Sequence, residues 1–276
     1  IGMQRTRRMF STLNRYAKPV SMRDIIALDE DDVVAIASRN LIDGTDMFIN
    51  ERILDAKTKA IPEENDRALT SIITYYECNK ELLWLFIKDK EIKGLDDKVI
   101  KGHKKINEYI RHRPDDEMIA LFTNECKTFW NAIIESCSEG INENNDGVGK
   151  YRDKNGGHIF FRPVSLIPFT KMVVRIKEIE DVDYASIIER LPEKIKWIQC
   201  KLWRRVIWDD VKKGMIMGNS KLIELLLLYV YDKSILTSAE MKRISKDLES
   251  IWNYHERDIH EVLDDIIQEL TERSCT

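Results

Sequence analysis

Hydrophobic residues recur at helical spacing along most of the chain, as expected of helices that pack one face against a core. In the first half, this spacing predicts helices over residues 4–17, Asp32–Leu41, Ala68–Ile87, Asp97–His112 and Asp115–Cys137. Acidic side chains from Asp29 to Asp32 favour the start of the second helix, because a carboxylate there accepts hydrogen bonds from free N–H groups. Pro114 separates the last two helices, since proline has no N–H to donate.

The segment Asn142–Gly157 interrupts the pattern. It contains four Gly and four Asn, so we expect an exposed, flexible loop over residues 142–157 in place of a helix. This loop divides the chain into a helical region of residues 1–141 and a C-terminal helical region of residues 158–276, which we expect to pack on the first.

Beyond the loop the pattern is again helical. It predicts a helix that follows Pro163 and runs to about Glu178, a buried segment Leu222–Tyr231, and one long final helix that includes Met241 to Leu270. Apolar residues of that final helix recur every 3.6 residues on average, which is typical of globular packing and not of a coiled coil. Short strands are plausible only at Ile1–Met3 and His158–Phe161.

Composition agrees with a helical fold. The chain has 276 residues, of which 43% are hydrophobic, and only 11 Gly and 6 Pro. We therefore predict a mainly α, multi-helix globular domain with at most a few short strands. No apolar run reaches the roughly 18 residues of a membrane helix, so we expect a cytoplasmic protein without a membrane partner.

The residue types of common catalytic and metal sites do not fall into the required patterns. The sequence contains no Gly-rich phosphate loop, no H-E-x-x-H and no G-x-S-x-G. The five His stand too far apart for a shared metal, and the five Cys contain no C-x-x-C pair. We therefore expect no catalytic residue, no metal and no cofactor in this chain, and reduced thiols that are mostly buried.

Charge is distributed unevenly. The net charge is −4, yet residues 1–23 contain six Lys or Arg and no acid, whereas five acids follow within residues 24–32. Because Arg and Lys supply the electrostatic part of phosphate binding, the opening segment is a candidate contact for DNA or nucleotide phosphates. The candidate residues are Arg5, Arg7, Arg8, Asn14, Arg15 and Lys18. A solvated helix face is the alternative interpretation of these cations, and helix capping and packing are the alternative roles for Asn14 and Arg15.

A secondary basic patch falls on the predicted helix Asp97–His112 and just beyond it. Its members are Lys98, Lys101, Lys104, Lys105, Arg111 and Arg113. Asp96, Asp97 and Glu108 dilute the positive charge, so a solvated helix face is the favoured interpretation of this patch and a phosphate-binding surface is the alternative.

Several short runs resemble a known family. They are Arg8-Met-Phe-Ser-Thr-Leu-Asn-Arg-Tyr-Ala-Lys-Pro19, Asp31-Asp-Val-Val-Ala-Ile-Ala-Ser-Arg39, Lys57-Thr-Lys-Ala-Ile-Pro62, Leu69-Thr-Ser-Ile72, Gly157-His-Ile-Phe-Phe-Arg-Pro163 and Trp203-Arg-Arg-Val-Ile-Trp208. Together they resemble the DGQHR-domain family, whose best-known branch is DndB of bacterial DNA phosphorothioation. The resemblance covers most of residues 4–232. The DGQHR pentapeptide itself is missing from the chain.

The resemblance implies a function in DNA modification. In that family the DGQHR part is similar to the ParB N-terminal fold, so residues 1–141 are expected to include a remnant of such a domain. Asn14 and Arg15 are similar in character to a box that completes the ParB phosphate site. Because Ile1 is not an initiator, we expect a preceding segment, and an NTP is a possible cofactor if that segment carries the missing motif.

Three functions follow as hypotheses. The first is a DNA-binding regulatory or accessory protein of a bacterial DNA-modification or anti-phage system, with DNA and other proteins of that system as partners. The second is an NTP-hydrolysing component of a DNA-modification complex. The third is a helical scaffold that docks other proteins. The missing pentapeptide argues against an enzyme formed by this chain alone, so the first hypothesis is preferred.

If the opening cations bind DNA, changing Arg5, Arg7, Arg8 and Arg15 to Ala will weaken binding to every duplex sequence alike. Each lost phosphate contact is expected to lower the slope of log K against log salt concentration by about one unit. Fluorescence anisotropy of labelled duplex DNA at several salt concentrations measures this slope. Circular dichroism must show that the variant stays folded, and an unchanged slope in the folded variant rejects the site.

Overall fold

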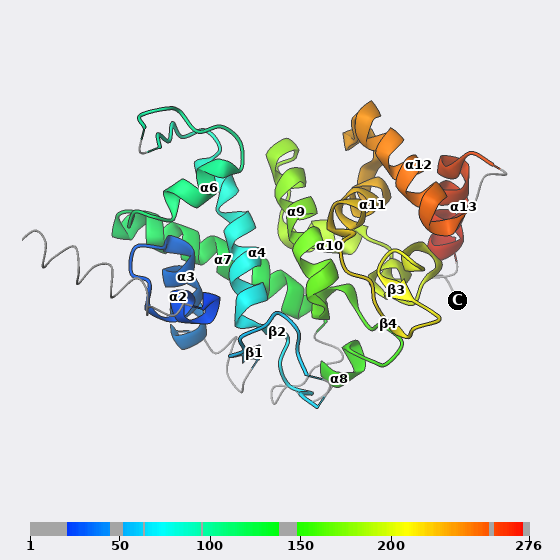
Figure 1. The fold of residues 1–276 in the computed structure, drawn as a ribbon, viewed down its shortest axis with the longest axis horizontal. Coiled ribbons are helices and arrows are strands. Elements are labelled where there is room, and N and C mark those ends of the chain that lie inside the picture. Colours follow the sequence, from blue (N-terminus) through cyan, green and yellow to red (C-terminus); the bar gives the residue numbers. More distant parts are fainter. Residues whose placement is uncertain are drawn as a thin grey trace, which may run out of the picture.

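Helices account for nearly all the regular structure in the part of the chain that can be described (Figure 1). The computed structural model describes residues 21–44, 52–62, 64–94, 96–137, 148–253 and 257–272. The α-helices are α2 (Met22–Leu28), α3 (Val33–Gly44), α4 (Ile72–Leu82), α5 (Trp84–Ile87), α6 (Lys104–Tyr109), α7 (Asp116–Ser136), α8 (Val148–Tyr151), α9 (Pro163–Ile179), α10 (Tyr184–Arg190), α11 (Ser220–Asp232), α12 (Ser238–Trp252) and α13 (Ile259–Glu272). The predicted mainly α class is confirmed.

Short 3-10 helices and strands complete the fold. The 3-10 helices are η3 (Ile159–Phe161), η4 (Glu193–Lys196), η5 (Lys201–Trp203) and η6 (Lys233–Ile235). Strand β1 (Ile53–Leu54) pairs in parallel with β2 (Thr70–Ser71), and β3 (Trp208–Asp209) pairs antiparallel with β4 (Gly214–Met215). All four strands are two residues long, so they link helices and form no layer of their own.

Helix α9 lies at the centre of the described fold, between α4 and α11 (Figure 1). Its buried residues fall on most sides of the helix, as expected when two neighbours pack on opposite faces. Its buried hydroxyls bond to backbone carbonyls: Ser165 Oγ donates to Ile159 O at 2.7 Å and Thr170 Oγ1 to Leu166 O at 3.0 Å. The helix therefore meets little water except near its ends.

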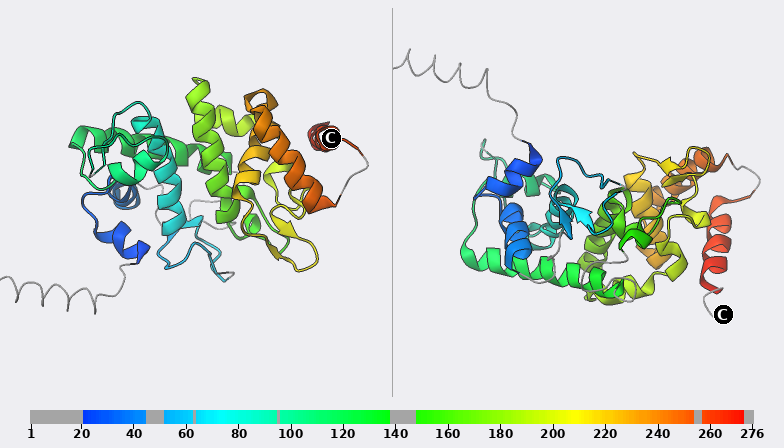
Figure 2. Two further views of the ribbon diagram at one scale, coloured as in Figure 1. Left: turned by 45° about the horizontal axis from the view of Figure 1, so that its top comes forward. Right: turned by 90° about the horizontal axis from the view of Figure 1, so that it is seen from below.

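The first half of the chain packs around α4 and α7. Helix α3 contacts α2, α4 and α7, while α10 packs on α7 from the second half of the sequence (Figure 2). Asp115 caps α7, since its side chain accepts from Met118 N, and the predicted bounds of this helix are confirmed. Asp32 plays the same role for α3: its Oδ1 accepts from Val34 N at 2.8 Å.

Two buried polar contacts join these helices. Tyr76 donates its hydroxyl to Asp32 Oδ2 at 2.6 Å, which connects α4 to the cap of α3. One turn further along α4, Asn79 donates to Ser38 Oγ at 3.0 Å and accepts from Trp130 Nε1 at 2.8 Å. Because Asn79 is fully buried, its amide fixes the positions of α3 and α7 relative to α4.

Two predicted helix extents in the first half of the chain are wrong. The helix expected over Asp97–His112 is only α6, because Asp97 and Gly102 adopt left-handed backbone with φ of 59° and 62°. The helix expected over Ala68–Ile87 begins at Ile72, after β2, and Leu83 separates α4 from α5. In each case a local turn or a strand pairing, and not the apolar spacing, determines where the helix begins.

The single long final helix is also a wrong prediction. Asn253 takes a left-handed conformation with φ of 52° and closes α12, with its N–H bonded to Glu249 O. Helix α13 then packs against η4 and η5 as well as α12. The apolar spacing continues across the break because the two helices bury separate stripes.

The proposed strand and loop near the middle of the chain differ from the structure as well. His158–Phe161 contains no strand: η3 forms there, with a single bridge from His158 to Trp197. Within the expected loop 142–157, residues 148–151 form α8 and Val148 is buried. The possible strand Ile1–Met3 lies outside the described residues.

Leu222–Tyr231 is buried within α11 as predicted, although Val230 is only partly covered. Cys78, Cys126 and Cys137 are free and buried, and Cys200 is partly exposed. Among the helices that the structure describes, none is long and apolar enough to cross a membrane.

We expect Asn79→Ala to lower the free energy of unfolding by about 2–4 kcal/mol, because it leaves the buried Trp130 Nε1 without an acceptor and opens a small cavity. Urea denaturation at 25 °C measures this change. Asn124→Ala on the exposed face of α7 is the matched control and should change stability by less than about 0.5 kcal/mol. Equal effects of the two substitutions would contradict the role of the Asn79 contacts.

Candidate functional site

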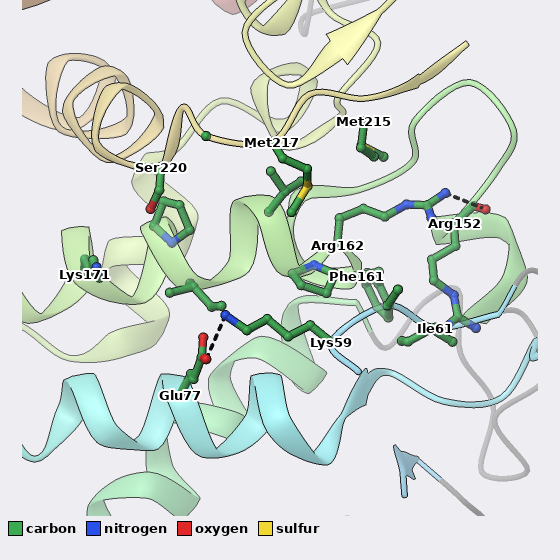
Figure 3. A pocket seen from close by; sticks show the side chains of 16 residues that line it. Lys59, Ile61, Glu77, Arg152, Phe161, Arg162, Lys171, Met215, Met217 and Ser220 are labelled. Atoms are coloured by element: carbon green, nitrogen blue, oxygen red, sulfur yellow. Dashed lines mark hydrogen bonds and ion pairs between the residues drawn. The ribbon is translucent and has the colours of Figure 1, made fainter. Parts of the chain in front are cut away.

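A cavity of about 400 Å³ opens between α4, the start of α9 and the segment that leads into α11 (Figure 3). Segments far apart in sequence line it: Lys59–Ile61, Arg152, Phe161–Val164 and Met215–Ser220 contribute, together with Glu77 and parts of α9. Two of these segments belong to the runs that carry the family resemblance, Lys57–Pro62 and Gly157–Pro163. We call this cavity the central pocket.

Arg162 holds one wall of the central pocket in place. Its Nε donates to Gly156 O at 2.8 Å, and its Nη2 donates to the carbonyl oxygens of Arg152 and Asp153, both at 3.0 Å. A guanidinium offers five donors in a rigid fork, which suits it to gather several carbonyls at once. The loop 152–156 is thereby fixed against the first turn of α9.

Two glycines permit this close approach. Gly157 has φ of +83°, and a Cβ there would lie 2.1 Å from Tyr151 O. Gly156 has φ of +122°, and a Cβ there would lie 2.9 Å from Ile198 Cγ2. Neither position can accept a side chain without displacement of the backbone or of the packed core, so the loop depends on both glycines.

Arg152 places a second guanidinium on the same wall, beside Arg162 (Figure 3). Its Nη2 donates to Asn65 O, whereas its Nη1 is buried and has no hydrogen-bond partner among the described residues. Burial, and secondly the charge of Arg162, lower the pKa of Arg152 to about 10, and Asp66 opposes this shift. Arg152 therefore stays charged at neutral pH while one of its donors is unsatisfied.

Lys59 extends across the pocket toward α4 (Figure 3). Its Nζ lies 2.7 Å from Glu77 Oε1, and about half of the Lys59 side chain is exposed. Its backbone carbonyl accepts from Ser71 Oγ, the N-cap of α4, at 3.0 Å. Lys171 lines the opposite side and lies 3.6 Å from Glu81, which belongs to a neighbouring cavity. The lining therefore holds four cationic side chains and one carboxylate.

Two helix N-termini border the central pocket. Helix α9 begins at Pro163 and α11 begins at Ser220, and neither start has a side-chain cap. By contrast, α4, α7 and α12 begin with Ser71, Asp115 and Thr237 as side-chain caps. Free N–H groups and the positive end of the helix dipole add to the charge of the lysines and arginines, so the local potential favours an anion.

The remaining lining is apolar. Phe161, Ile167, Met215 and Met217 belong to it, and Met217 is 73% exposed at the pocket edge. Methionine side chains adapt their shape and make favourable contacts with aromatic rings. The pocket therefore combines a cationic wall with an apolar wall.

The residues proposed from sequence fall in different places. Arg5, Arg7, Arg8, Asn14, Arg15 and Lys18 lie outside the described residues, so the structure does not place them. The secondary basic patch is described, and its charges do not form one unpaired face: Lys98 pairs with Asp96 at 2.7 Å and Arg111 with Glu108 at 3.5 Å. Arg113 pairs with Asp116, and Lys105 donates to the carbonyls of Lys88 and Lys90. Lys101 and Lys104 are exposed.

Sequence reasoning did not select the residues of the central pocket. Lys59 and Arg162 lie in runs that carry the resemblance, but these runs were not treated as a site. Arg152 lies in the segment predicted to be a flexible loop. The Gly156-Gly157 pair was the available signal, because consecutive glycines allow the backbone to approach another segment closely.

Comparisons with known protein families, with curated proteins and with solved structures find no match to this chain. Within the described ranges, no group of three or more His, Cys, Asp or Glu side chains is arranged to hold a metal ion.

The buried side chain of His158 is expected to make the stability of the fold depend on pH. Burial, and secondly the charge of Lys196, lower its pKa to about 3. The unfolded state takes up a proton as pH falls below the usual 6.5, whereas the folded state stays neutral, so stability is lost as pH falls from 6.5 toward 3. Between pH 7 and pH 5 we expect a loss of about 2 kcal/mol from this group.

His158→Asn isolates that contribution, because Asn retains an acceptor for the Phe160 N–H, which His158 Nδ1 accepts at 3.3 Å. Urea denaturation of both proteins at pH 7 and pH 5 gives the difference. The variant should be less stable than the parent at pH 7, yet lose about 2 kcal/mol less on going to pH 5. An identical loss in both proteins would show that His158 is not buried in its neutral form.

Proposed function

We propose that the central pocket binds the phosphate-bearing part of a nucleotide, and that the chain acts as a DNA-binding regulatory or accessory protein of a bacterial DNA-modification or anti-phage system. One observation carries the first part: Arg152 and Arg162 place two adjacent positive charges on the pocket wall, and no described residue supplies an acceptor for Arg152 Nη1. A phosphate oxygen is an acceptor of matching charge, and guanidinium groups bind phosphate with two donors at once.

The second wall fits the rest of a nucleotide. A base offers a flat apolar face, and Ile167, Met215 and Met217 offer contacts suited to such a face. The volume of about 400 Å³ lies in the range that small organic ligands occupy. A free sulfate or phosphate ion would leave the apolar wall unused, so an amphipathic ligand fits better than a bare anion.

The resemblance to the DGQHR-domain family supports the DNA-related part of the proposal. Its runs Lys57–Pro62 and Gly157–Pro163 supply Lys59 and Arg162 to the same pocket. The net charge of −4 makes general attraction of duplex DNA weak, so phosphate binding by this chain depends on local clusters of cations. The opening segment of residues 5–18 stays a proposed second cluster.

Hydrolysis of a bound nucleotide is the second candidate function. Glu77 is the carboxylate that lines the pocket, and its Oε1 lies 2.7 Å from Lys59 Nζ. A carboxylate close to a phosphate can orient water for attack, and a lysine can stabilise the charge that develops. Release of inorganic phosphate from ATP by the parent protein, absent in Glu77→Gln, would favour this function over binding alone.

Binding of a fluorescent adenine nucleotide, methylanthraniloyl-ADP, tests the proposed pocket. We expect Arg152→Gln and Lys59→Ala each to weaken binding about 10-fold or more, since each removes a charge-assisted contact to phosphate. Fluorescence anisotropy at 100 mM salt measures the dissociation constant. Competition by unlabelled ADP should exceed competition by adenosine, which lacks phosphate.

Lys154→Ala is the matched control for Arg152→Gln. Lys154 lies in the same loop, is exposed and does not line the pocket. Its substitution by Ala removes one positive charge, as Arg152→Gln does. Its affinity should equal that of the parent. If all three variants bind like the parent, or if the folded parent does not bind the nucleotide at millimolar concentration, the proposed pocket function is wrong.

A further inference from the structure

A second cavity of about 400 Å³ lies at the junction of η5, α12 and α13. Lys201, Arg204, Arg205, Trp252 and Ile266 line it. Three of the five lining residues are cations, and the other two are an indole and an aliphatic side chain. We call this cavity the Trp252 groove, and it shares no lining residue with the central pocket.

The cations of the Trp252 groove are accessible. Arg205 is exposed, its backbone has a left-handed φ of 59°, and no ion pair to it is seen among the described residues. Arg204 pairs with Asp210 at 2.6 Å and Lys201 with Glu269 at 2.6 Å, but both cations are more than 60% exposed. Exposed ion pairs contribute little stability, so these side chains are able to exchange a carboxylate for a phosphate.

Trp252 provides a fixed aromatic surface. Its Nε1 donates to Arg204 O at 2.9 Å, which ties the ring to the backbone of the cationic segment. The side chain is half-buried, and Ile266 of α13 lies beside it in the groove. A ring held in this way loses little freedom when another flat group stacks on it.

One segment connects the groove to the central pocket. Residues 204–205 line the groove, the chain then forms the β3–β4 hairpin, and Met215 and Met217 line the pocket. The hairpin turn adds Lys212 and Lys213, both exposed, and Asp209 accepts from Val211 N and Lys212 N to shape the turn. The segment thus carries four cations and two acids between two cavities.

We infer that the Trp252 groove binds single-stranded nucleic acid, with phosphates at Arg204, Arg205 and Lys201 and one base stacked on Trp252. Cations beside an aromatic ring are the features that bind single strands, because every base has a face that stacks. In a duplex the base faces are covered by their neighbours, so the indole could not be used. The choice of nucleic acid as the ligand rests on the proposed function, whereas the residues of the groove are different from those of the central pocket.

Fluorescence anisotropy of 5′-fluorescein-labelled dT12 with the full chain, at 50 to 200 mM salt, tests the inference. We expect Arg205→Ala to weaken binding about 5-fold or more and to lower the salt slope by about 0.7. Trp252→Leu, which leaves the charge unchanged, should weaken binding between about 5-fold and 100-fold with little change in slope. A 12-base-pair duplex of mixed sequence should bind more weakly than dT12 and respond less to Trp252→Leu.

Controls separate this site from other causes. Lys242→Ala, an exposed cation on α12 outside the groove, makes the same charge change as Arg205→Ala and should bind dT12 like the parent. Thermal unfolding must show that Trp252→Leu is folded; if it is not, Trp252→Phe replaces it and should retain most of the affinity. Binding of methylanthraniloyl-ADP should be unchanged in Arg205→Ala, so failure at the central pocket and failure here are distinguishable.

Three results would overturn the inference. The first is an equal loss of dT12 affinity in Arg205→Ala and Lys242→Ala. The second is a folded Trp252→Leu protein that binds dT12 like the parent. The third is competition by poly-glutamate as strong as competition by unlabelled dT12 at equal charge concentration, which would assign the groove to acidic peptides.

Discussion

The central pocket depends on the three hydrogen bonds that the Arg162 guanidinium donates to the carbonyl oxygens of Arg152, Asp153 and Gly156. These carbonyls lie in a turn outside any helix or strand, where Gly156 N also donates to Asp153 O at 3.2 Å, and a partly buried carbonyl without a donor is costly. One guanidinium satisfies three of them and so fixes the loop. The same contact brings Arg152 beside Arg162, so two positive charges lie close together near the start of α9.

The burial of α9 explains why the charges of Arg152 and Arg162 lie on the wall of a cavity. A helix packed on opposite faces by α4 and α11 is free of neighbours chiefly at its ends, and its N-terminal N–H groups have no partners within the helix. Arg162 and Pro163 begin α9 without a side-chain cap, and the start of α11 at Ser220 lies on the same cavity. The N-terminal ends of two helices and several cationic side chains therefore act on one space of about 400 Å³.

The parts of the fold that follow local rules were predictable from the sequence. Helix α7 was found almost to the residue because Asp115 marks its start and its apolar face is uninterrupted. The predicted helix bounds were wrong where the backbone conformation of one residue ends or delays a helix. Asn253 ends α12 in a left-handed turn, and the left-handed Gly102 precedes the start of α6. Such turns leave the apolar spacing intact, so periodicity does not reveal them. The central pocket was not predictable, since it requires that Lys59, Arg152 and Met215 come together across some 150 residues of sequence.

An acidic net charge does not prevent the two cationic cavities from binding an anion at short range. A chain of net charge −4 gains little from long-range attraction of polyphosphate, and salt screens what attraction there is within about 10 Å. Discrimination then rests on contacts at short range, where Arg152 and Arg162 act beside an apolar wall and Arg204 and Arg205 act beside Trp252. In both places cationic side chains lie beside an apolar or aromatic surface. Under the two proposals, this arrangement would favour nucleotides and unpaired strands over a duplex, because the base faces of a duplex are covered by their neighbours.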